Sequence, residues 1–360
     1  MNWPLIISGL AVGMIFGFVL QHGRFCMNTA FREVLLSRDF TVFRAYLLAL
    51  LILIVGANLM EVTGIIHLRK IPFNWLANMV GGYIFGIGMV IGGGCASGTL
   101  YRIGEGMIGS WLAALGFMLT TAAMLGGVLQ PLTVFMQNGT ENFPLVYNLP
   151  DDQAVTIYNL IGIDRWVLIA IIAVPVLIFI GRGKFKKPAT QKGFIWWSTG
   201  IMIGLIGVIA FYASEVWGGL PNARGLSFTG PLNEIIAWFT SSSTAGSFKQ
   251  IATENQVEIG NLSNAGTMTW SIWMIFGVVL GSLLSAIRSK EFGWRSPKAQ
   301  TLATQFGGGL IMGIGGSIAG GCNVGHGLTG LATLSIGSLV GIISIVLGCW
   351  TMVYFLFIRE

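Results

Sequence analysis

The feature that most constrains the fold is a segment of 18 residues that occurs twice in the chain. Residues 81–98 read GGYIFGIGMVIGGGCASG, and residues 308–325 read GGLIMGIGGSIAGGCNVG, at a constant offset of 227 positions. The copies align without a gap and are identical at 11 of the 18 positions, including Cys95 and Cys322. A repeated thiol inside a glycine-rich apolar segment predicts two related halves that each bring a cysteine to one central site.

Long apolar stretches indicate the environment of this fold. Hydrophobic residues make up 54% of the 360 residues and charged residues only 9%, which is typical of a polytopic membrane protein. A helix needs about 20 apolar residues to cross the hydrocarbon core of a bilayer. The sequence therefore predicts an all-α polytopic membrane protein with about nine transmembrane helices plus short re-entrant helices. The predicted spans are 5–21, 43–60, 75–94, 108–130, 165–181, 194–214, 268–287, 302–321 and 334–358.

The charges between these spans predict an orientation. The loop at 182–192 carries five basic residues and no acid, and the loop at 288–298 carries four basic residues and one acid. The loop at 131–164 carries four acids and no basic residue. Because basic loops stay in the cytoplasm, we expect a bacterial inner-membrane protein with its N-terminus outside and its C-terminus cytoplasmic. The net charge of +6 is then a topology signal, and we expect no nucleic-acid partner.

The spans also predict how the two halves are related. The first copy of the repeat lies on the third span and the second copy on the eighth, so the copies run through the bilayer in opposite directions. We therefore expect an inverted-topology repeat made of residues 1–130 and 194–360, with residues 131–193 as a connector that contains the fifth span. In folds of this kind the binding site lies near the bilayer midplane, at the interface of the halves.

Glycine runs mark the expected helix breaks. The runs at 92–94 and 320–321 destabilise a continuous helix by about 1 kcal/mol for each glycine. We therefore place Gly94 and Gly321 in a central path with the cysteines that follow them. A third thiol, Cys26, lies just after the first span, whereas Cys349 lies inside the last span without a glycine run and is expected to be a packing residue.

The cysteine motifs resemble the YeeE/YedE sulphur-transport family of bacterial inner-membrane proteins, the thiosulfate transporters. The resemblance is carried by GRFCMNTAFRE around Cys26, GGYIFGIGMVIGGGCASGTLYRIGEGMIGSW around Cys95 and GGLIMGIGGSIAGGCNVGHGL around Cys322. It implies an hourglass-shaped fold and import of thiosulfate past the three thiols, which contact the ion in turn through S–H groups. It also implies a small soluble cytoplasmic protein similar to sulphur carriers as a partner, expected here as a separate chain.

The chemistry of such a path is consistent with these residue types. Thiosulfate is a dianion with a soft terminal sulfur and three hard oxygens, and conduction needs contacts that are weak and repeated. Neutral thiols are weak hydrogen-bond donors, and the N-termini of interrupted helices add partial positive charge without a buried Lys or Arg at the midplane. Four further candidates for the path flank the thiols: Ser97, Asn323, Arg102 and Arg24. For the two arginines, attraction of the anion and a purely topological role both remain open.

Several other functions compete with this interpretation. Cys95 and Cys322 could form a structural disulfide, or could bind a soft metal with His22 and His326, although no CxxC or HxxxH spacing is present. A membrane thiol redox protein and a transporter of another sulphur or selenium species are further alternatives. No GxxxxGK[ST] phosphate-binding loop is present, which argues against a primary pump. We expect no enzymatic activity, no cofactor and no metal site.

Overall fold

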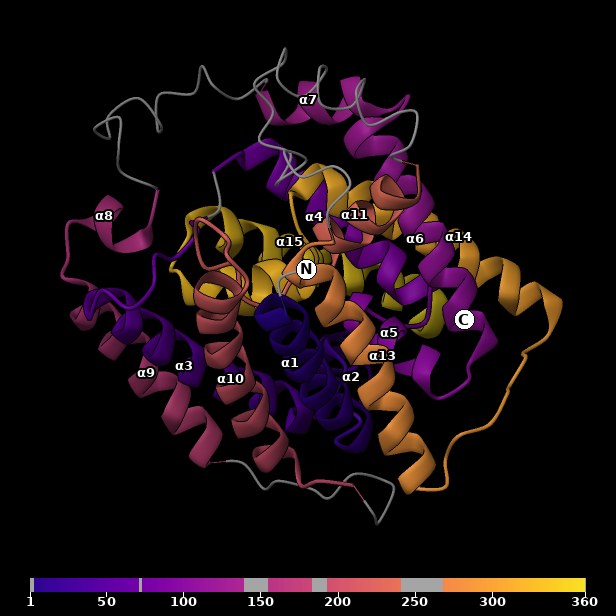
Figure 1. Cartoon of the computed structure of the whole chain (residues 1–360), viewed down its shortest axis with the longest axis horizontal. Coiled ribbons are helices and arrows are strands. Elements are labelled where there is room, and N and C mark those ends of the chain that lie inside the picture. The colour runs from indigo at the N-terminus through magenta and orange to yellow at the C-terminus, as the bar shows by residue number, and fades with distance from the viewer. Residues whose placement is uncertain (1–2, 71–72, 139–154, 183–192, 241–267, 360) are drawn as a thin grey trace.

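A computed structural model describes residues 3–70, 73–138, 155–182, 193–240 and 268–359 of the chain (Figure 1). These residues form helices joined by turns and by isolated backbone bridges. The first part of the chain forms α1 (Trp3–His22), α2 (Met27–Leu36), α3 (Thr41–Val62), α4 (Trp75–Ile91), α5 (Ala96–Gly104), α6 (Ile108–Gly126) and α7 (Gln130–Asn138). The middle forms α8 (Ile157–Ile161), α9 (Arg165–Gly181), α10 (Trp196–Tyr212), η1 (Ala213–Trp217) and α11 (Thr229–Thr240). The last part forms α13 (Trp270–Arg288), α14 (Ala299–Ala319), η3 (Gly325–Gly330), α15 (Ile336–Val353) and η4 (Tyr354–Ile358).

Each of the nine predicted spans coincides with a helix. In the part of the chain that the structure describes, eight helical segments are long and apolar enough to cross a membrane, and the fifth predicted span, α9, is a shorter apolar helix. Large apolar side chains such as Ile15, Leu59, Leu119 and Ile343 are exposed on the outside of the bundle, where a soluble protein would carry polar residues. The prediction of a polytopic, all-helical membrane protein is confirmed.

Glycines set the close packing of the helices, and the contact of α1 with α13 shows why they are needed. A Cβ atom built on Gly13 would lie 2.1 Å from the backbone oxygen of Met274, and one on Gly17 would lie 2.0 Å from that of Val278. From the other side, a Cβ on Gly281 would lie 1.9 Å from the backbone oxygen of Met14. Small residues thus allow backbone-to-backbone contact, which is the main source of helix association in lipid.

The main helix contacts join helices of the first half of the chain to helices of the second half. Helices α4 and α14, which carry the repeat, pack against each other; α6 packs on α14, and α15 packs on α4. In the same way α13 packs on α1, and α3 packs on α10. In Figure 1, α3, α9 and α10 lie on one side of α1, and α6 and α14 lie on the other. An approximate two-fold relation between the halves would produce these matched pairs of contacts.

The ends of the helices separate into two edges. The C-terminal ends of α9 and α13, which precede the two basic loops, lie at the lower edge of Figure 1, and α7 lies along the upper edge. Helix α7 opens the acidic loop predicted at 131–164, of which residues 139–154 are outside the described residues. The helix ends that precede the two basic loops are therefore at the opposite edge from α7.

Candidate functional site

Both copies of the repeat contain a helix break, as the glycine runs predicted. Helix α4 ends at Ile91, and Gly93 then adopts a left-handed backbone conformation with φ of 73° before α5 begins. Helix α14 ends at Ala319, and Gly320 adopts the same conformation with φ of 76°. A residue with a side chain is strained at such φ values, so glycine at these positions allows the helix to stop and a new one to start.

Each motif cysteine occupies the residue immediately before a helical segment. Cys95 is the N-cap of α5, and its Sγ accepts the backbone N–H of Gly98 at 3.3 Å. Cys322 precedes the helical segment 323–332, and its Sγ accepts the N–H of Gly325 at 3.5 Å. Cys26 is the N-cap of α2 in an extended backbone conformation. A thiol at these positions lies where free N–H groups and the helix dipole favour negative charge.

Two of the thiols are in direct contact. The Sγ atoms of Cys26 and Cys95 are 3.4 Å apart, and the hydroxyl of Ser97 lies 3.4 Å from Cys95 Sγ. Both cysteines are at most 1% exposed. A Cβ atom on Gly98 would lie 2.7 Å from Cys26 Sγ and 3.3 Å from Cys95 Sγ, so this glycine makes room for the thiol pair. The repeat signalled Gly98, which it matches to Gly325, but the sequence did not indicate its role.

Cys95 and Cys322 follow opposite ends of the antiparallel α4–α14 pair. Gly92, at the end of α4, packs on Gly308, whereas the amide of Asn78, near the start of α4, donates to the backbone oxygen of Ala319 at 3.0 Å. These two ends of the pair are about 20 Å apart for a rise of 1.5 Å per residue. The expectation that Cys95 would lie close to Cys322 came from the repeat, but the thiol in contact with Cys95 is Cys26. A repeat fixes which residues are equivalent and not how far each lies from the axis that relates them.

The surroundings of Cys322 are polar. Asn323 is fully buried, and neither its Nδ2 nor its Oδ1 has a hydrogen-bond partner. His326 is also fully buried; its Nε2 lies 3.0 Å from the backbone oxygen of Ala319, and its Nδ1 has no hydrogen-bond partner. A Cβ atom on Gly321 would lie 3.1 Å from His326 Nε2, so this glycine accommodates the imidazole ring. A buried amide without partners is rare in proteins and is typical of a place where a ligand or water binds.

Arg102 folds back toward the break before Cys95. Its guanidinium donates to the backbone oxygen of Gly93 and would lie 3.2 Å from a Cβ atom on Gly94. Within the described residues no carboxylate lies within ion-pair distance of Arg102. Arg102 therefore caps the C-terminal end of α4 and carries its positive charge beside the glycine break, on the Cys95 side of α5.

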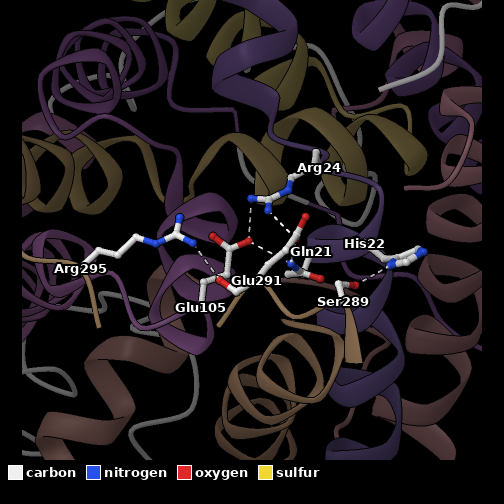
Figure 2. Close-up of polar contacts among 7 residues, drawn as sticks. All are labelled: Gln21, His22, Arg24, Glu105, Ser289, Glu291 and Arg295. Atoms are coloured by element: carbon white, nitrogen blue, oxygen red, sulfur yellow. Dashed lines mark hydrogen bonds and ion pairs between the residues drawn. The ribbon is translucent and has the colours of Figure 1, made fainter. Parts of the chain in front are cut away.

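Arg24 is bound between two acids (Figure 2). Its guanidinium donates to Glu105 Oε1 at 2.7 Å and to Glu291 Oε2 at 2.5 Å, and Gln21 Nε2 donates to the same two oxygens at 3.1 and 2.9 Å. The sequence singled out Arg24 but did not indicate these partners: Glu105 comes from the end of α5 and Glu291 from the turn after α13. His22, from the end of α1, contacts Ser289 Oγ at 3.3 Å.

The structure also bears on Cys349 and on the alternative interpretations as a structural disulfide or a metal site. All four cysteines are free and buried, so the disulfide between Cys95 and Cys322 is not formed in this structure. Cys349 lies 3.8 Å from the amide oxygen of Asn28, inside the packed bundle. Among the residues that the structure describes, no group of three or more His, Cys, Asp or Glu side chains could hold a metal ion.

Comparison with known proteins relates this arrangement to a family. A family model described as sulphur transport matches residues 22–351. The thiosulfate transporter TsuA of Escherichia coli (strain K12) is 31% identical over 374 aligned residues, which cover 99% of this chain and 96% of that protein. The thiosulfate transporter TsuA of Spirochaeta thermophila is 32% identical over 360 residues, which cover 99% of this chain and 100% of that protein. The probable transporter YedE of Escherichia coli is 28% identical over 116 residues, 32% of this chain and 28% of that protein. This chain, a multi-pass membrane protein with no enzymatic function, therefore belongs to the sulphur transport family of transporters.

Proposed function

We propose that this protein imports thiosulfate across the bacterial inner membrane for sulphur assimilation. Two relatives that align along the whole chain are named thiosulfate transporters. The proposed path leads past Cys322 to the contacting pair Cys95 and Cys26, because Cys322 lies toward the start of α4 and Cys95 follows its end. The N-terminus is proposed to lie outside. The C-terminal ends of α9 and α13, each followed in the sequence by a basic loop, lie at the edge opposite α7, which supports this orientation.

The observation that carries the proposal is the buried, unpaired amide of Asn323, the residue that directly follows the buried Cys322. Burying an amide without a partner costs about 1–3 kcal/mol, so hydrogen bonds from this amide to a ligand would recover that cost. The oxygens of thiosulfate accept hydrogen bonds from Nδ2, and its terminal sulfur contacts the S–H group of Cys322. Asn323 and Cys322 thereby serve the hard and the soft ends of one ion.

The second stage of the path is the pair Cys26 and Cys95. Two thiols at 3.4 Å provide adjacent weak donors, each at the start of a short helix whose free N–H groups favour an anion. Arg102 adds positive charge nearby without contacting the sulfurs, since its guanidinium is bound to the backbone oxygen of Gly93. Shallow, successive contacts allow the ion to leave each site, as conduction requires.

Growth on thiosulfate tests this function. A strain that cannot assimilate sulphate, and that lacks its own thiosulfate transporter, is supplied with thiosulfate as the sole sulphur source, with and without this gene. We expect growth only with the gene, and equal growth of both strains on cysteine. Selenium and other sulphur anions are then added as competitors, because the same thiols and amide would bind close analogues. Gene-independent growth, or a metal-dependent phenotype without a sulphur phenotype, would contradict the proposal.

A further inference from the structure

A cluster of three charged residues and one glutamine lies beyond the thiol pair, and we call it the Arg24 cluster: Gln21, Arg24, Glu105 and Glu291 (Figure 2). Glu105 is the C-cap of α5, whose N-cap is Cys95. Arg24 precedes Cys26 by two residues in the turn between α1 and α2. Since α5 has nine residues, a length of about 14 Å, the cluster and the thiol pair lie at the two ends of one short helix.

The charges of the cluster oppose the passage of an anion. Two carboxylates face one guanidinium, so the cluster carries one net negative charge. Arg295 is close by, but its guanidinium donates to the backbone oxygen of Glu291 at 3.0 Å and not to a carboxylate. A dianion that leaves the thiols therefore meets two carboxylates, and the guanidinium of Arg24 is already ion-paired with both of them. It can bind Arg24 only if one carboxylate gives way.

The two sides of the cluster differ in how firmly they are held. The turn that carries Glu291 is tied to the α5–α6 turn by backbone hydrogen bonds from the N–H of Gly293 to Glu105 at 3.2 Å and from the N–H of Arg295 to Gly106 at 3.1 Å. Arg24, by contrast, has a left-handed backbone with φ of 50°, which is unfavourable for a residue with a side chain. The N–H groups of Gly23, Arg24 and Phe25 also form backbone hydrogen bonds, but they donate to α1 itself and not to α5 or the turn after α13. The α1–α2 turn is therefore held to the other side of the cluster by its ion pairs, and it is the side that can move once they break.

We propose that the Arg24 cluster is the inner gate of the path, an inference that rests on the proposed transport of a thiosulfate-like dianion. The arriving ion competes with Glu291 for Arg24. The side chain of Glu291 is 23% exposed and that of Glu105 is 9% exposed, so Glu291 is the partner that water solvates on release. The α1–α2 turn then shifts with Cys26, the exit opens, and the ion pairs re-form behind the departing ion.

The accessibility of Cys26 tests the gate without relying on transport. The purified protein in lipid nanodiscs is treated with a charged, membrane-impermeant methanethiosulfonate, and labelling of Cys26 is followed by peptide mass spectrometry. Glu291→Gln removes the charge but keeps the shape. Arg24→Lys keeps the charge but loses the planar guanidinium, whose two terminal nitrogens each contact one carboxylate. We expect each to raise the labelling rate of Cys26 by about fivefold, the effect of weakening one partly exposed ion pair. The matched control is Glu33→Gln, which removes an acid paired with Arg32 on α2, outside the cluster, and leaves the rate unchanged.

Two outcomes decide the inference. Faster labelling in both cluster variants but not in Glu33→Gln supports the gate, whether or not the protein carries thiosulfate. Labelling within twofold of wild type in both variants, with melting temperatures that show normal folding, overturns it even if thiosulfate uptake is intact. In proteoliposomes loaded with thiosulfate, Glu291→Gln is also expected to increase passive efflux; unchanged efflux contradicts the gate, whereas absence of efflux and uptake in wild type contradicts the proposed function instead.

Discussion

The two helix breaks share a sequence but differ in the groups that surround their cysteines. At the first break Cys95 lies against a second thiol, Cys26, and the setting is dominated by sulfur. At the second break Cys322 has no thiol partner within the described residues, and its neighbour is the unpaired amide of Asn323. A duplicated motif thus retains the helix break and a cysteine before the next helical segment in both halves, while the residues around the cysteine differ. Under the proposed function, this difference suits the first break to the soft sulfur and the second to the hard oxygens of the ion.

Removal of the thiols is expected to have the largest effect. Cys95→Ala and Cys322→Ala should each reduce thiosulfate-dependent growth to the level without the gene, while the amount of protein in the membrane stays normal. A cysteine-to-alanine change in a core typically costs about 1 kcal/mol, too little to unfold a bundle of this size. The matched control is Cys349→Ala, which removes a buried thiol outside the path. Equal growth of all three variants would show that the motif cysteines are packing residues at both breaks.

Gly98→Ala and Gly325→Ala compare the two breaks at equivalent positions. The new methyl group at position 98 would lie 2.7 Å from Cys26 Sγ, so the thiol must rotate away from Cys95. At position 325 it would lie 3.9 Å from Cys322 Sγ, an ordinary contact. Loss of one weak contact of about 1.4 kcal/mol predicts uptake reduced about tenfold in Gly98→Ala. Initial rates of labelled thiosulfate uptake measure this effect, and a similar loss in Gly325→Ala would contradict the difference between the breaks.

Asn323→Ala tests whether the amide at the second break binds the oxygens of thiosulfate. Since the amide is buried and has no hydrogen-bond partner, its removal should raise the melting temperature by relieving a penalty of about 1–3 kcal/mol. The same change should raise the thiosulfate concentration for half-maximal uptake about fivefold, because the hydrogen bonds to the oxygens are lost. Ser97→Ala, beside the thiol pair, is expected to change neither the melting temperature nor the thiosulfate concentration for half-maximal uptake by much. A variant Asn323→Ala that is less stable, with unchanged uptake, would mean that the amide serves packing.

The glycines with left-handed backbones should give the smallest effects. Gly320→Ala places a methyl group in open space but at φ of 76°, so the expected cost is backbone strain of about 1–2 kcal/mol without a clash. The control is Gly307→Ala in the middle of α14, which also meets nothing within 4 Å and should be slightly stabilising. Thermal unfolding in detergent measures both changes. Loss of uptake in Gly320→Ala at normal stability would indicate a direct role in the path.

The helices of the fold could be predicted from the sequence because their signals are local. Apolar length predicted the nine helices, and glycine runs predicted both breaks, since each depends on neighbouring residues alone. The thiols could be located in the same way. Their pairing could not, because the approach of Cys26 to Cys95 depends on how α2 packs beside α5 and on the missing side chain of Gly98.

The charged cluster shows a second limit. Arg24, Glu105 and Glu291 are each ordinary in their local sequence. They meet because the C-terminal ends of α1, α5 and α13 lie close together in the fold. No periodicity or motif joins positions that are 81 and 267 residues apart. The sequence left both attraction of the anion and a purely topological role open for Arg24, and it did not reveal the two carboxylates that bind its guanidinium.

The most direct test of the account is uptake of labelled thiosulfate by purified Cys95→Ser in proteoliposomes, compared with wild type and with Cys349→Ser. Serine keeps a hydrogen-bond donor of similar shape but replaces a polarisable sulfur with a hard oxygen. If the thiol pair binds the soft sulfur of the ion, Cys95→Ser transports about tenfold more slowly than wild type, and Cys349→Ser transports normally. If Cys95→Ser transports as fast as wild type, contact between the substrate and the soft thiol is not how this protein moves its ion.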